Sequence, residues 1–229
     1  MQKNNLTTIE GRNSVLESLK SDRNIKKIII DSSALGKKIE TIILLANNKK
    51  IEISYADRFN LNKMSATRDH GGVIALASRI DFISFKKFLS QNQNTKDLAI
   101  VVLRSLIHDQ NFGAIIRTAC ASGIQAIALT KEKKGFFINP NVEKVSQGGT
   151  NYISFIKESF FSLLKNLDKE GFKIIIVENN ASNLYFNEDL TGKVALIFGN
   201  EAETLSKKNI GNYVKIPMSA NISSLNVSV

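Results

Sequence analysis

The chain has 229 residues, of which 43% are hydrophobic and 23% are charged, and its formal net charge at pH 7 is +10. This composition suffices for one large or two modest soluble domains, and the basic excess favours a polyanionic partner, either nucleic acid or an anionic membrane surface. No run of about eighteen apolar residues occurs and the N-terminus is polar, so we expect neither a membrane-spanning helix nor a signal peptide. The single cysteine, Cys120, excludes an internal disulfide and favours the reducing cytoplasm; with only two histidines in the chain, it also argues against a metal site.

The basic residues are densest in the first part of the chain. Residues 1–80 hold 14 Lys and Arg against 8 Asp and Glu, a net of +6, whereas residues 81–229 hold 17 against 13, a net of +4. The lysines occur in pairs at 26–27, 37–38 and 49–50. No amphipathic stretch combines a basic face with bulky apolar anchors, which favours RNA or DNA over a membrane. Taken alone, paired lysines are also typical of a solvated face.

Helices and strands alternate at short intervals in residues 1–80. Apolar residues at helical spacing, including Val15 and Leu19, predict a helix over residues 7–20. The elements expected after it are a strand at 25–31, a helix at 37–48, a strand at 51–55, a short helix at 58–64 and a strand at 73–77. This alternation predicts a small α/β domain, which we assign to residues 1–79.

Residues 80–96 differ in character from their neighbours. They begin with apolar and aromatic residues, which predict a short helix, and end in the polar run 91–96, which has no periodicity. We therefore place a linker between two domains at residues 80–96.

From residue 97 the predicted strands are longer and more apolar. The strand at 98–103 is apolar on both faces, as strands of parallel sheets are. The helix after it is expected to end at Gly123, which suits a left-handed cap. The other expected elements are strands at 124–130, 152–156, 172–178 and 193–198 and helices at 141–147 and 160–170. The sequence thus predicts a second α/β domain with a mainly parallel sheet over residues 97–229.

The pattern of the final stretch predicts a strand, a turn and the start of a helix. The strand begins at Tyr213, and Pro217 marks its end or an edge position. Ser224 is placed to cap a helix that begins at Leu225. Because one helical turn is not stable by itself in water, we expect the last residues either to fray or to pack against a partner.

The first group of candidate site residues follows the strand at 98–103. Ligands of open α/β sheets bind outside the carboxyl ends of the strands. Asn111 is expected at the start of the next helix, where its amide can cap the helix or be presented to a ligand. Arg117 shares a helix face with Gly113, which predicts space for a substrate beside the guanidinium. Without the other motifs, Arg117 is better explained as an exposed residue of an amphipathic helix than as part of a substrate site.

Two further groups lie nearer the C-terminus. Gly199 and Glu201 follow the strand at 193–198, and Ser224 and Asn226 lie in the final stretch. They supply backbone amides, a carboxylate, a hydroxyl and an amide, but no nucleophile–base pair; acids after a glycine turn are also typical of ordinary helix capping. There is no P-loop, no Gly-x-Gly-x-x-Gly after the first long strand and no metal-ligand cluster, so common phosphoryl transfer and dinucleotide binding are unsupported.

Three motifs follow one another along the chain: Asn-x-Gly-Ala-x-x-Arg-Thr-Ala at 111–119, Gly-x-Glu at 199–201 and Ile-Pro-Met…Ser-Leu-Asn-Val-Ser at 216–228. They resemble the signatures of the SpoU (TrmH) family of RNA ribose 2′-O-methyltransferases in the SPOUT superfamily. The run 144–149 is similar to a helix end of that family. Gly-Arg-Asn at 11–13 and His-Gly-Gly with the residues that follow it resemble the small RNA-binding domain of the RlmB-type branch, which methylates a guanosine ribose in large-subunit ribosomal RNA.

The resemblance implies a fold and an assembly. The fold is an L30e/L7Ae-like RNA-binding domain followed by an α/β-knot (SPOUT) domain, whose C-terminal region pairs two protomers in a homodimer. The family has a closing helix after this point, so the resemblance also implies a chain truncated before its last helix. Gln110 stands where the family usually has proline, and Ala202 and Thr204 replace two glycines, which would strain that loop if either position needs a positive φ.

The resemblance also implies methyl transfer from S-adenosyl-L-methionine to a ribose 2′-hydroxyl of ribosomal RNA, with transfer RNA as the alternative. Arginine is effectively always protonated, so we prefer electrostatic stabilisation of the developing alkoxide over a role as base for the arginine of the first motif. The implied catalytic residues are Arg117, Asn111, Glu201, Ser224 and Asn226, and the implied cofactor contacts are Gly199, Ile216 and Leu225. A rival interpretation is an RNA-binding protein that has lost catalysis, because the truncated end removes the element that closes the cofactor loop.

Overall fold

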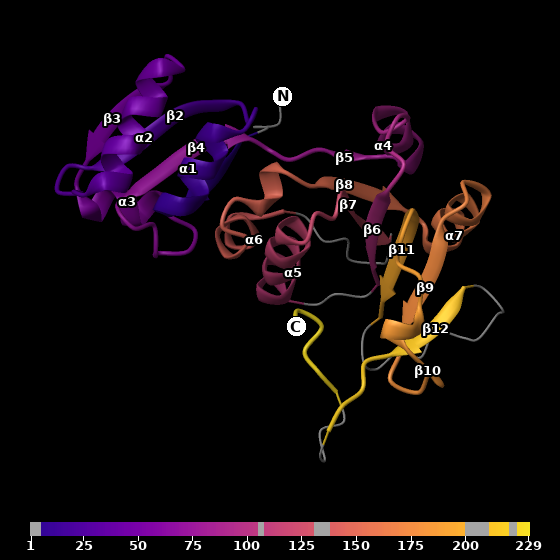
Figure 1. Ribbon diagram of the computed structural model, residues 1–229. Helices are drawn as coiled ribbons and strands as arrows, with labels where there is room; N and C mark the ends of the chain where they lie inside the picture. The colour runs from indigo at the N-terminus through magenta and orange to yellow at the C-terminus, as the bar shows by residue number, and fades with distance from the viewer. Residues whose placement is uncertain (1–5, 105–107, 131–137, 200–210, 220–223) are drawn as a thin grey trace. The chain divides into compact units, whose positions relative to one another are not determined.

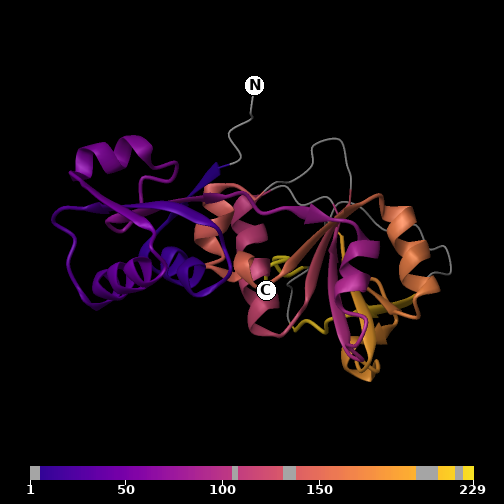
Figure 2. The ribbon, with the colours of Figure 1, turned by 90° about the horizontal axis from the view of Figure 1, so that it is seen from above.

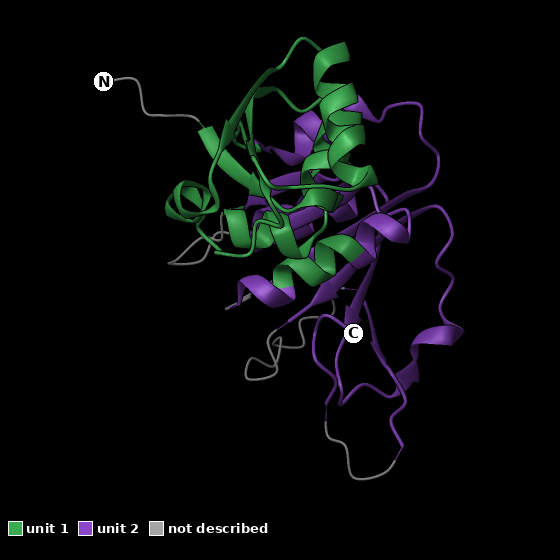
Figure 3. Ribbon diagram, turned by 90° about the vertical axis from the view of Figure 1, so that its left-hand side faces the viewer, with its two compact units in different colours: residues 1–80, 112–117, 137–152 green, residues 81–111, 118–136, 153–229 purple. Residues whose placement is uncertain are grey.

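The computed structural model describes residues 6–104, 108–130, 138–199, 211–219 and 224–229 (Figure 1). Contacts within the chain divide it into two compact units (Figure 3). Unit 1 comprises residues 1–80, 112–117 and 137–152, and unit 2 comprises residues 81–111, 118–136 and 153–229.

Unit 1 is built on a four-stranded sheet with the strand order β1-β4-β2-β3. In this sheet β4 runs antiparallel to β1 and to β2, and β2 pairs with β3 in parallel. The strands are β1 (Leu6–Glu10), β2 (Ile25–Asp31), β3 (Glu52–Ala56) and β4 (Val73–Ser78).

Helices cover both faces of this sheet. Figure 2 shows α1 (Arg12–Lys20) and α2 (Lys37–Asn48) on one face and α3 (Arg58–Met64) on the other. Successive residues of β2 serve the two faces in turn: Ile28 and Ile30 pack with α1 and α2, and Ile29 packs with α3. The chain therefore has the small α/β unit that its alternating pattern predicts.

The predicted helix over residues 7–20 is wrong in its first part. Leu6–Glu10 forms β1, which pairs with β4, and α1 begins only at Arg12. Between them Gly11 has φ 93°, a conformation that L side chains rarely adopt. The β-branched residues of β1 favour a strand where a partner edge exists, and β4 supplies that edge. The other predicted elements of this region are confirmed within one residue at each end.

A later segment, α6 (Pro140–Val145) with the 3₁₀ helix η1 (Gly149–Asn151), also belongs to unit 1 and packs on β1 and α1. Its Glu143 carboxylate is buried against the Arg23 guanidinium at 2.8 Å. Burial raises the pKa of Glu143 although the nearby guanidinium works to lower it. Gly148 has φ 92° and lies so close to the side chain of Glu17 that no Cβ fits there.

Unit 2 is built on a larger sheet, in which every pair of neighbouring strands in the described part is parallel. The strand order is β10-β12-β9-β11-β6-β7-β8-β5 (Figure 1). The strands are β5 (Phe82–Ile83), β6 (Leu98–Leu103), β7 (Ala126–Thr130), β8 (Ser154–Glu158), β9 (Lys173–Val177), β10 (Asn183–Leu184), β11 (Lys193–Phe198) and β12 (Asn212–Lys215). The predicted mainly parallel sheet is confirmed.

The core of unit 2 joins this sheet to two helices, α4 (Phe85–Gln91) and α7 (Phe160–Lys169). Phe85 and Phe88 of α4 and Leu163 and Leu167 of α7 are buried together with residues of β6, β9 and β11. The short helix predicted at the start of residues 80–96 is therefore confirmed as α4. The helix after β6 is α5 (Asp109–Ala121), and Gly123 follows it with φ 76°, as predicted.

Several boundaries differ from the prediction. The strand expected at 152–156 is β8, at 154–158, because the residues before it form η1 and a short turn. The helix expected at 141–147 is α6, which is shorter. The short strand β10 was not predicted, because two residues carry no readable alternation.

The helix predicted to begin at Leu225 is wrong within the described residues. Only a turn forms there, in which the Val229 amide donates to the Asn226 carbonyl at 2.9 Å. The Ser228 amide and hydroxyl both donate to Asn226 Oδ1, at 3.0 and 2.8 Å. Asn226 rather than Ser224 therefore caps this turn, since an Asn side chain readily accepts from the backbone two residues on.

Candidate active site

Three neighbouring strands of unit 2 deliver their carboxyl ends to one edge of the sheet. In the order β12-β9-β11 all three run parallel, and Val177 of β9 pairs with both Phe198 of β11 and Val214 of β12. Gly199 follows β11 directly and Ile216 follows β12, so the two lie beyond the ends of strands that flank β9. This edge is where ligands bind in open parallel sheets.

The residues predicted to hold a cofactor are accessible. Gly199 is half-buried, whereas Ile216 and Leu225 expose 37% and 41% of their surface. Ile216 directly follows β12, and an apolar side chain that stays exposed near a strand end is available to cover an apolar part of a ligand. Of the other residues in the final stretch, Ser224 is half-buried and Asn226 is exposed.

Between these strand ends lies a residue that the sequence did not single out, Glu178. It follows β9, and its amide donates to the Val214 carbonyl at 2.8 Å. Both of its carboxylate oxygens are buried and have no hydrogen-bond partner among the residues that the structure describes. In the sequence, a glutamate after an apolar strand suggests only an exposed end. The position of this residue between two flanking strands is known only from the register.

The first predicted motif lies on α5. The helix begins at Asp109, so Asn111 is in its first turn but is not the cap, a position taken by His108. Arg117 is exposed, and among the described residues its guanidinium makes no hydrogen bond or ion pair. Arg117 follows Asn111 by six positions, which places the two about 9 Å apart along the helix axis and on different sides of the helix. The spacing therefore does not favour a direct contact between these side chains.

The space predicted beside Gly113 is already filled. A Cβ at this position would lie 2.5 Å from Val145 Cβ and 2.7 Å from Val145 Cγ1 of α6. Gly113 thus permits the close approach of α5 and α6 and does not leave room for a substrate. The prediction took a missing side chain for a cavity, but protein interiors are close-packed and a neighbour fills such a gap.

The remaining predictions fall partly outside the described residues. Glu201 lies in 200–210 and cannot be placed, and the same is true of Ala202 and Thr204. The described part of the chain contains no group of three or more His, Cys, Asp and Glu residues that could hold a metal ion. No helix among the described residues is long and apolar enough to cross a membrane.

Comparison with known proteins assigns a class to this fold. Residues 98–229 match the model of the SpoU rRNA Methylase family, and residues 8–82 match the model described as RNA 2′-O ribose methyltransferase substrate binding. The fold and its two matched regions are those of an RNA methyltransferase with a substrate-binding domain. The first match, at residues 98–229, covers more than half of the chain. The chain therefore belongs to the SpoU methylase family.

Individual relatives agree over nearly the whole chain. A protein of the TrmH family of tRNA/rRNA methyltransferases from Staphylococcus aureus (strain MSSA476) is 29% identical over 230 residues, which cover 97% of this chain and 91% of that protein. A solved RNA 2′-O ribose methyltransferase superposes with a TM-score of 0.79 at 21% identity, covering 98% of this chain and 84% of that one. The SpoU methyltransferase AviRb from Streptomyces viridochromogenes, in complex with AdoMet, gives 0.78 at 17% identity, covering 98% and 85%. At these identities the structural likenesses show the fold.

Proposed function

We propose that this SpoU-family enzyme transfers a methyl group from S-adenosyl-L-methionine to the 2′-hydroxyl of a guanosine ribose in large-subunit ribosomal RNA. The observation that carries the proposal is the pairing, in one chain, of a substrate-binding region at 8–82 with a methylase region at 98–229. The greater density of positive charge in residues 1–80 supports RNA as the substrate. The ribosomal target and the RlmB-type specificity rest on the motifs at 11–13 and 70–73.

The strand ends of unit 2 suit S-adenosyl-L-methionine, which supplies the methyl group when bound. Gly199 brings backbone without a side chain to the end of β11, and Ile216 and Leu225 offer exposed apolar surface for the adenosyl group. The buried and unpartnered carboxylate of Glu178 at the same edge also calls for a polar ligand. We propose these residues as the wall of the cofactor site.

Within the chain, Arg117 is the residue we propose to act on the acceptor ribose. Its guanidinium is free among the described residues, always charged and able to hold a developing alkoxide and a neighbouring phosphate together. Asn111 would orient the ribose, and Glu201 would orient the guanidinium. Asn226 and Ser224 would hold the last loop in place, where Asn226 already accepts two hydrogen bonds from Ser228.

The larger assembly is also proposed. We assign residues 1–79 to RNA binding and residues 97–229 to methyl transfer, connected by residues 80–96. We further propose that the catalytic domain forms the trefoil knot of its family, that it pairs two protomers in a homodimer, and that the enzyme works in the cytoplasm, where its RNA substrate is.

The test is methylation of defined RNAs by the purified chain. We expect label from S-adenosyl-L-methionine to enter large-subunit ribosomal RNA at one 2′-O position. Label in transfer RNA alone would identify transfer RNA as the target. Transfer RNA is the second candidate because the relatives are described as tRNA/rRNA methyltransferases. Binding of RNA and cofactor without any transfer would instead favour the RNA-binding protein without catalysis.

A further inference from the structure

The end of β9 places one residue in a fixed position at the centre of the candidate site. Glu178 donates its amide to the Val214 carbonyl at 2.8 Å and accepts the Ala181 amide on its own carbonyl at 3.2 Å. Since β9 lies between β11 and β12, Gly199 and Ile216 follow the two strands that flank it. The backbone of Glu178 is therefore held by the sheet on one side and by a turn on the other.

The carboxylate of Glu178 differs from other buried carboxylates of this chain. Glu10 accepts hydrogen bonds from Ser65, Ala66 and Thr67, and Glu143 pairs with Arg23. Both oxygens of Glu178 are buried, and within the described part of the chain neither has a hydrogen-bond partner. A buried polar group without a hydrogen-bond partner is costly, so such a group in a folded protein points to a ligand, water or ion that completes it.

The geometry also limits the ligand group. Two adjacent acceptor oxygens lack donors, so the group that satisfies them best has two adjacent donors. The adenosyl ribose of S-adenosyl-L-methionine carries two vicinal hydroxyls, whereas the sulfonium carries charge on one atom and donates no hydrogen bond. We propose that Glu178 is a cofactor-binding residue whose carboxylate accepts hydrogen bonds from the two ribose hydroxyls of the methyl donor. This assignment rests on the proposed function.

The test compares cofactor binding by the wild-type chain and Glu178→Gln, measured by isothermal titration without RNA. We expect Glu178→Gln to weaken binding of S-adenosyl-L-methionine and of S-adenosylhomocysteine by the same factor, about tenfold or more. The 2′-deoxyadenosyl analogue of S-adenosylhomocysteine should bind the wild type more weakly than its parent. The variant should lose little further affinity with this analogue, because both changes remove the same hydrogen bond.

Controls separate this interaction from a structural role. Glu158→Gln changes a glutamate at the end of β8, whose Oε1 accepts from Ser162 at 2.9 Å, and should leave cofactor affinity unchanged. Without cofactor, Glu178→Gln should melt no lower than the wild type, because the carboxylate has no partner to lose. The comparison of S-adenosylhomocysteine with its 2′-deoxyadenosyl analogue uses only the wild type. It therefore remains valid even if the substitution disturbs folding.

Three results would overturn the assignment. Equal affinity of wild type and Glu178→Gln for both S-adenosyl-L-methionine and S-adenosylhomocysteine would show that the carboxylate does not bind the cofactor. A loss seen with S-adenosyl-L-methionine but not with S-adenosylhomocysteine would assign the carboxylate to the sulfonium instead. Failure of the wild type to bind either compound would overturn the proposed function itself, and is distinguishable because it appears before any substitution is made.

Discussion

At the scale of single residues, Arg117 carries most of the proposed chemistry. It is exposed on α5 and has no partner among the described residues, so its charge is available to a substrate. A guanidinium offers a planar fork that can bind an alkoxide and a phosphate at once, whereas an ammonium is a point charge. This difference makes the conservative substitution informative.

We expect Arg117→Lys to keep its cofactor affinity and to lose turnover by roughly 3–4 kcal/mol in activation free energy, the scale of a lost oxyanion donor. Single-turnover methyl transfer at saturating RNA measures the loss. Arg79→Lys, at an exposed arginine after β4, is the matched control and should retain turnover. Near-normal transfer by the Arg117 variant would remove this residue from the mechanism.

Glu10 illustrates how a buried carboxylate is stabilised in this chain. Burial works to raise its pKa, but hydrogen bonds from the Ser65 and Thr67 side chains and from the Ala66 and Thr67 amides outweigh burial and lower it. The Ala66 amide donates at 2.6 Å. Because the folded pKa lies below the ordinary value of 4.5, the stabilisation is complete above that pH and is lost as the pH falls through the folded value.

We therefore expect Glu10→Gln to lower the free energy of unfolding at pH 7 by about 1–3 kcal/mol, since its amide group would face donors. Urea unfolding between pH 7 and more acidic conditions should show the difference between wild type and variant shrinking below pH 4.5. Glu52→Gln, at an exposed carboxylate paired with Lys27, should cost less than about 1 kcal/mol. A pH-independent difference for Glu10→Gln would contradict the assignment.

At the scale of elements, the approach of α5 to α6 depends on Gly113. Helix propensity alone favours alanine over glycine by about 1 kcal/mol in a helix interior. Packing opposes it here, because the added Cβ would lie 2.5 Å from Val145 Cβ. Overpacking of this kind costs about 1–3 kcal/mol, so packing should outweigh propensity.

We expect Gly113→Ala to lower the free energy of unfolding, whereas helix propensity alone would raise it. Thr118→Ala, at an exposed position of the same helix, should change stability little and serves as the control. Chemical denaturation of both variants measures the difference. A stabilised Gly113→Ala protein would show that α6 does not lie against this face of α5.

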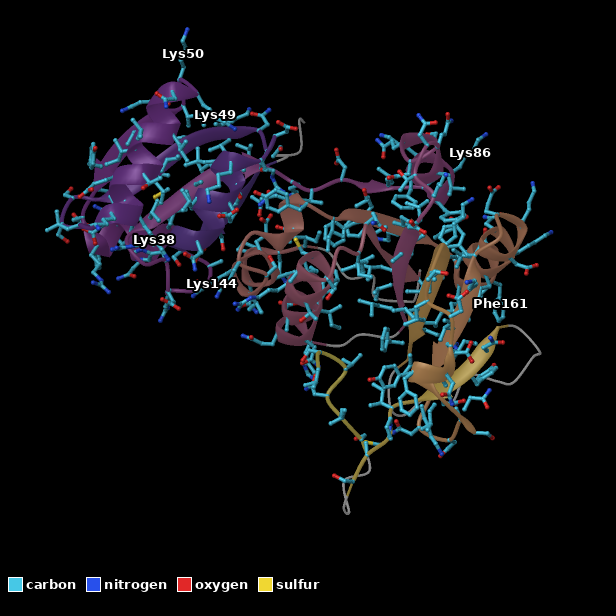
Figure 4. All side chains as sticks on the ribbon, viewed as in Figure 1. Lys38, Lys49, Lys50, Lys86, Lys144 and Phe161 are labelled. Carbon is cyan, nitrogen blue, oxygen red and sulfur yellow. The ribbon has the colours of Figure 1, made fainter. Side chains whose placement is uncertain are left out.

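At the scale of the whole molecule, the positive charge of residues 1–80 is not all equally available. Lys27 pairs with Glu52, and Lys38 donates to Asn13 at 2.6 Å. Lys26 and Lys37 are exposed, and their ammonium groups make no hydrogen bond or ion pair among the described residues. Figure 4 shows Lys38 and Lys50 on the surface of this region. We infer that the unpaired lysines contact more RNA phosphates than the paired lysines do.

For RNA binding we expect the double variant Lys26→Gln/Lys37→Gln to weaken affinity and to reduce the slope of log affinity against log salt by roughly one unit for each phosphate that is no longer neutralised. Lys27→Gln, which also removes a positive charge but one already paired with a carboxylate, should change the slope less. Titrations at several salt concentrations test this. An unchanged slope in the double variant would place the RNA footprint elsewhere.

The sequence by itself determined the types and order of most elements, because apolar spacing and glycine positions act locally. Strand β6, helix α2 and the end of α5 before Gly123 need no distant neighbour to be predicted. It also located Gly199 and Ile216 after strands, and the parallel sheet then brings them to one edge. The family motifs supplied the roles that we propose for those residues, which spacing alone leaves open.

Only the tertiary structure decided what depends on contacts between distant residues. β1 is a strand because β4 lies beside it, and Gly113 is a packing position because Val145 fills the space next to it. The isolation of the Glu178 carboxylate among the described residues likewise follows from its burial in the folded chain and not from its neighbours in sequence. Local sequence patterns do not show which side chains from distant parts of the chain pack against a residue. Those contacts determine its burial and its hydrogen bonds.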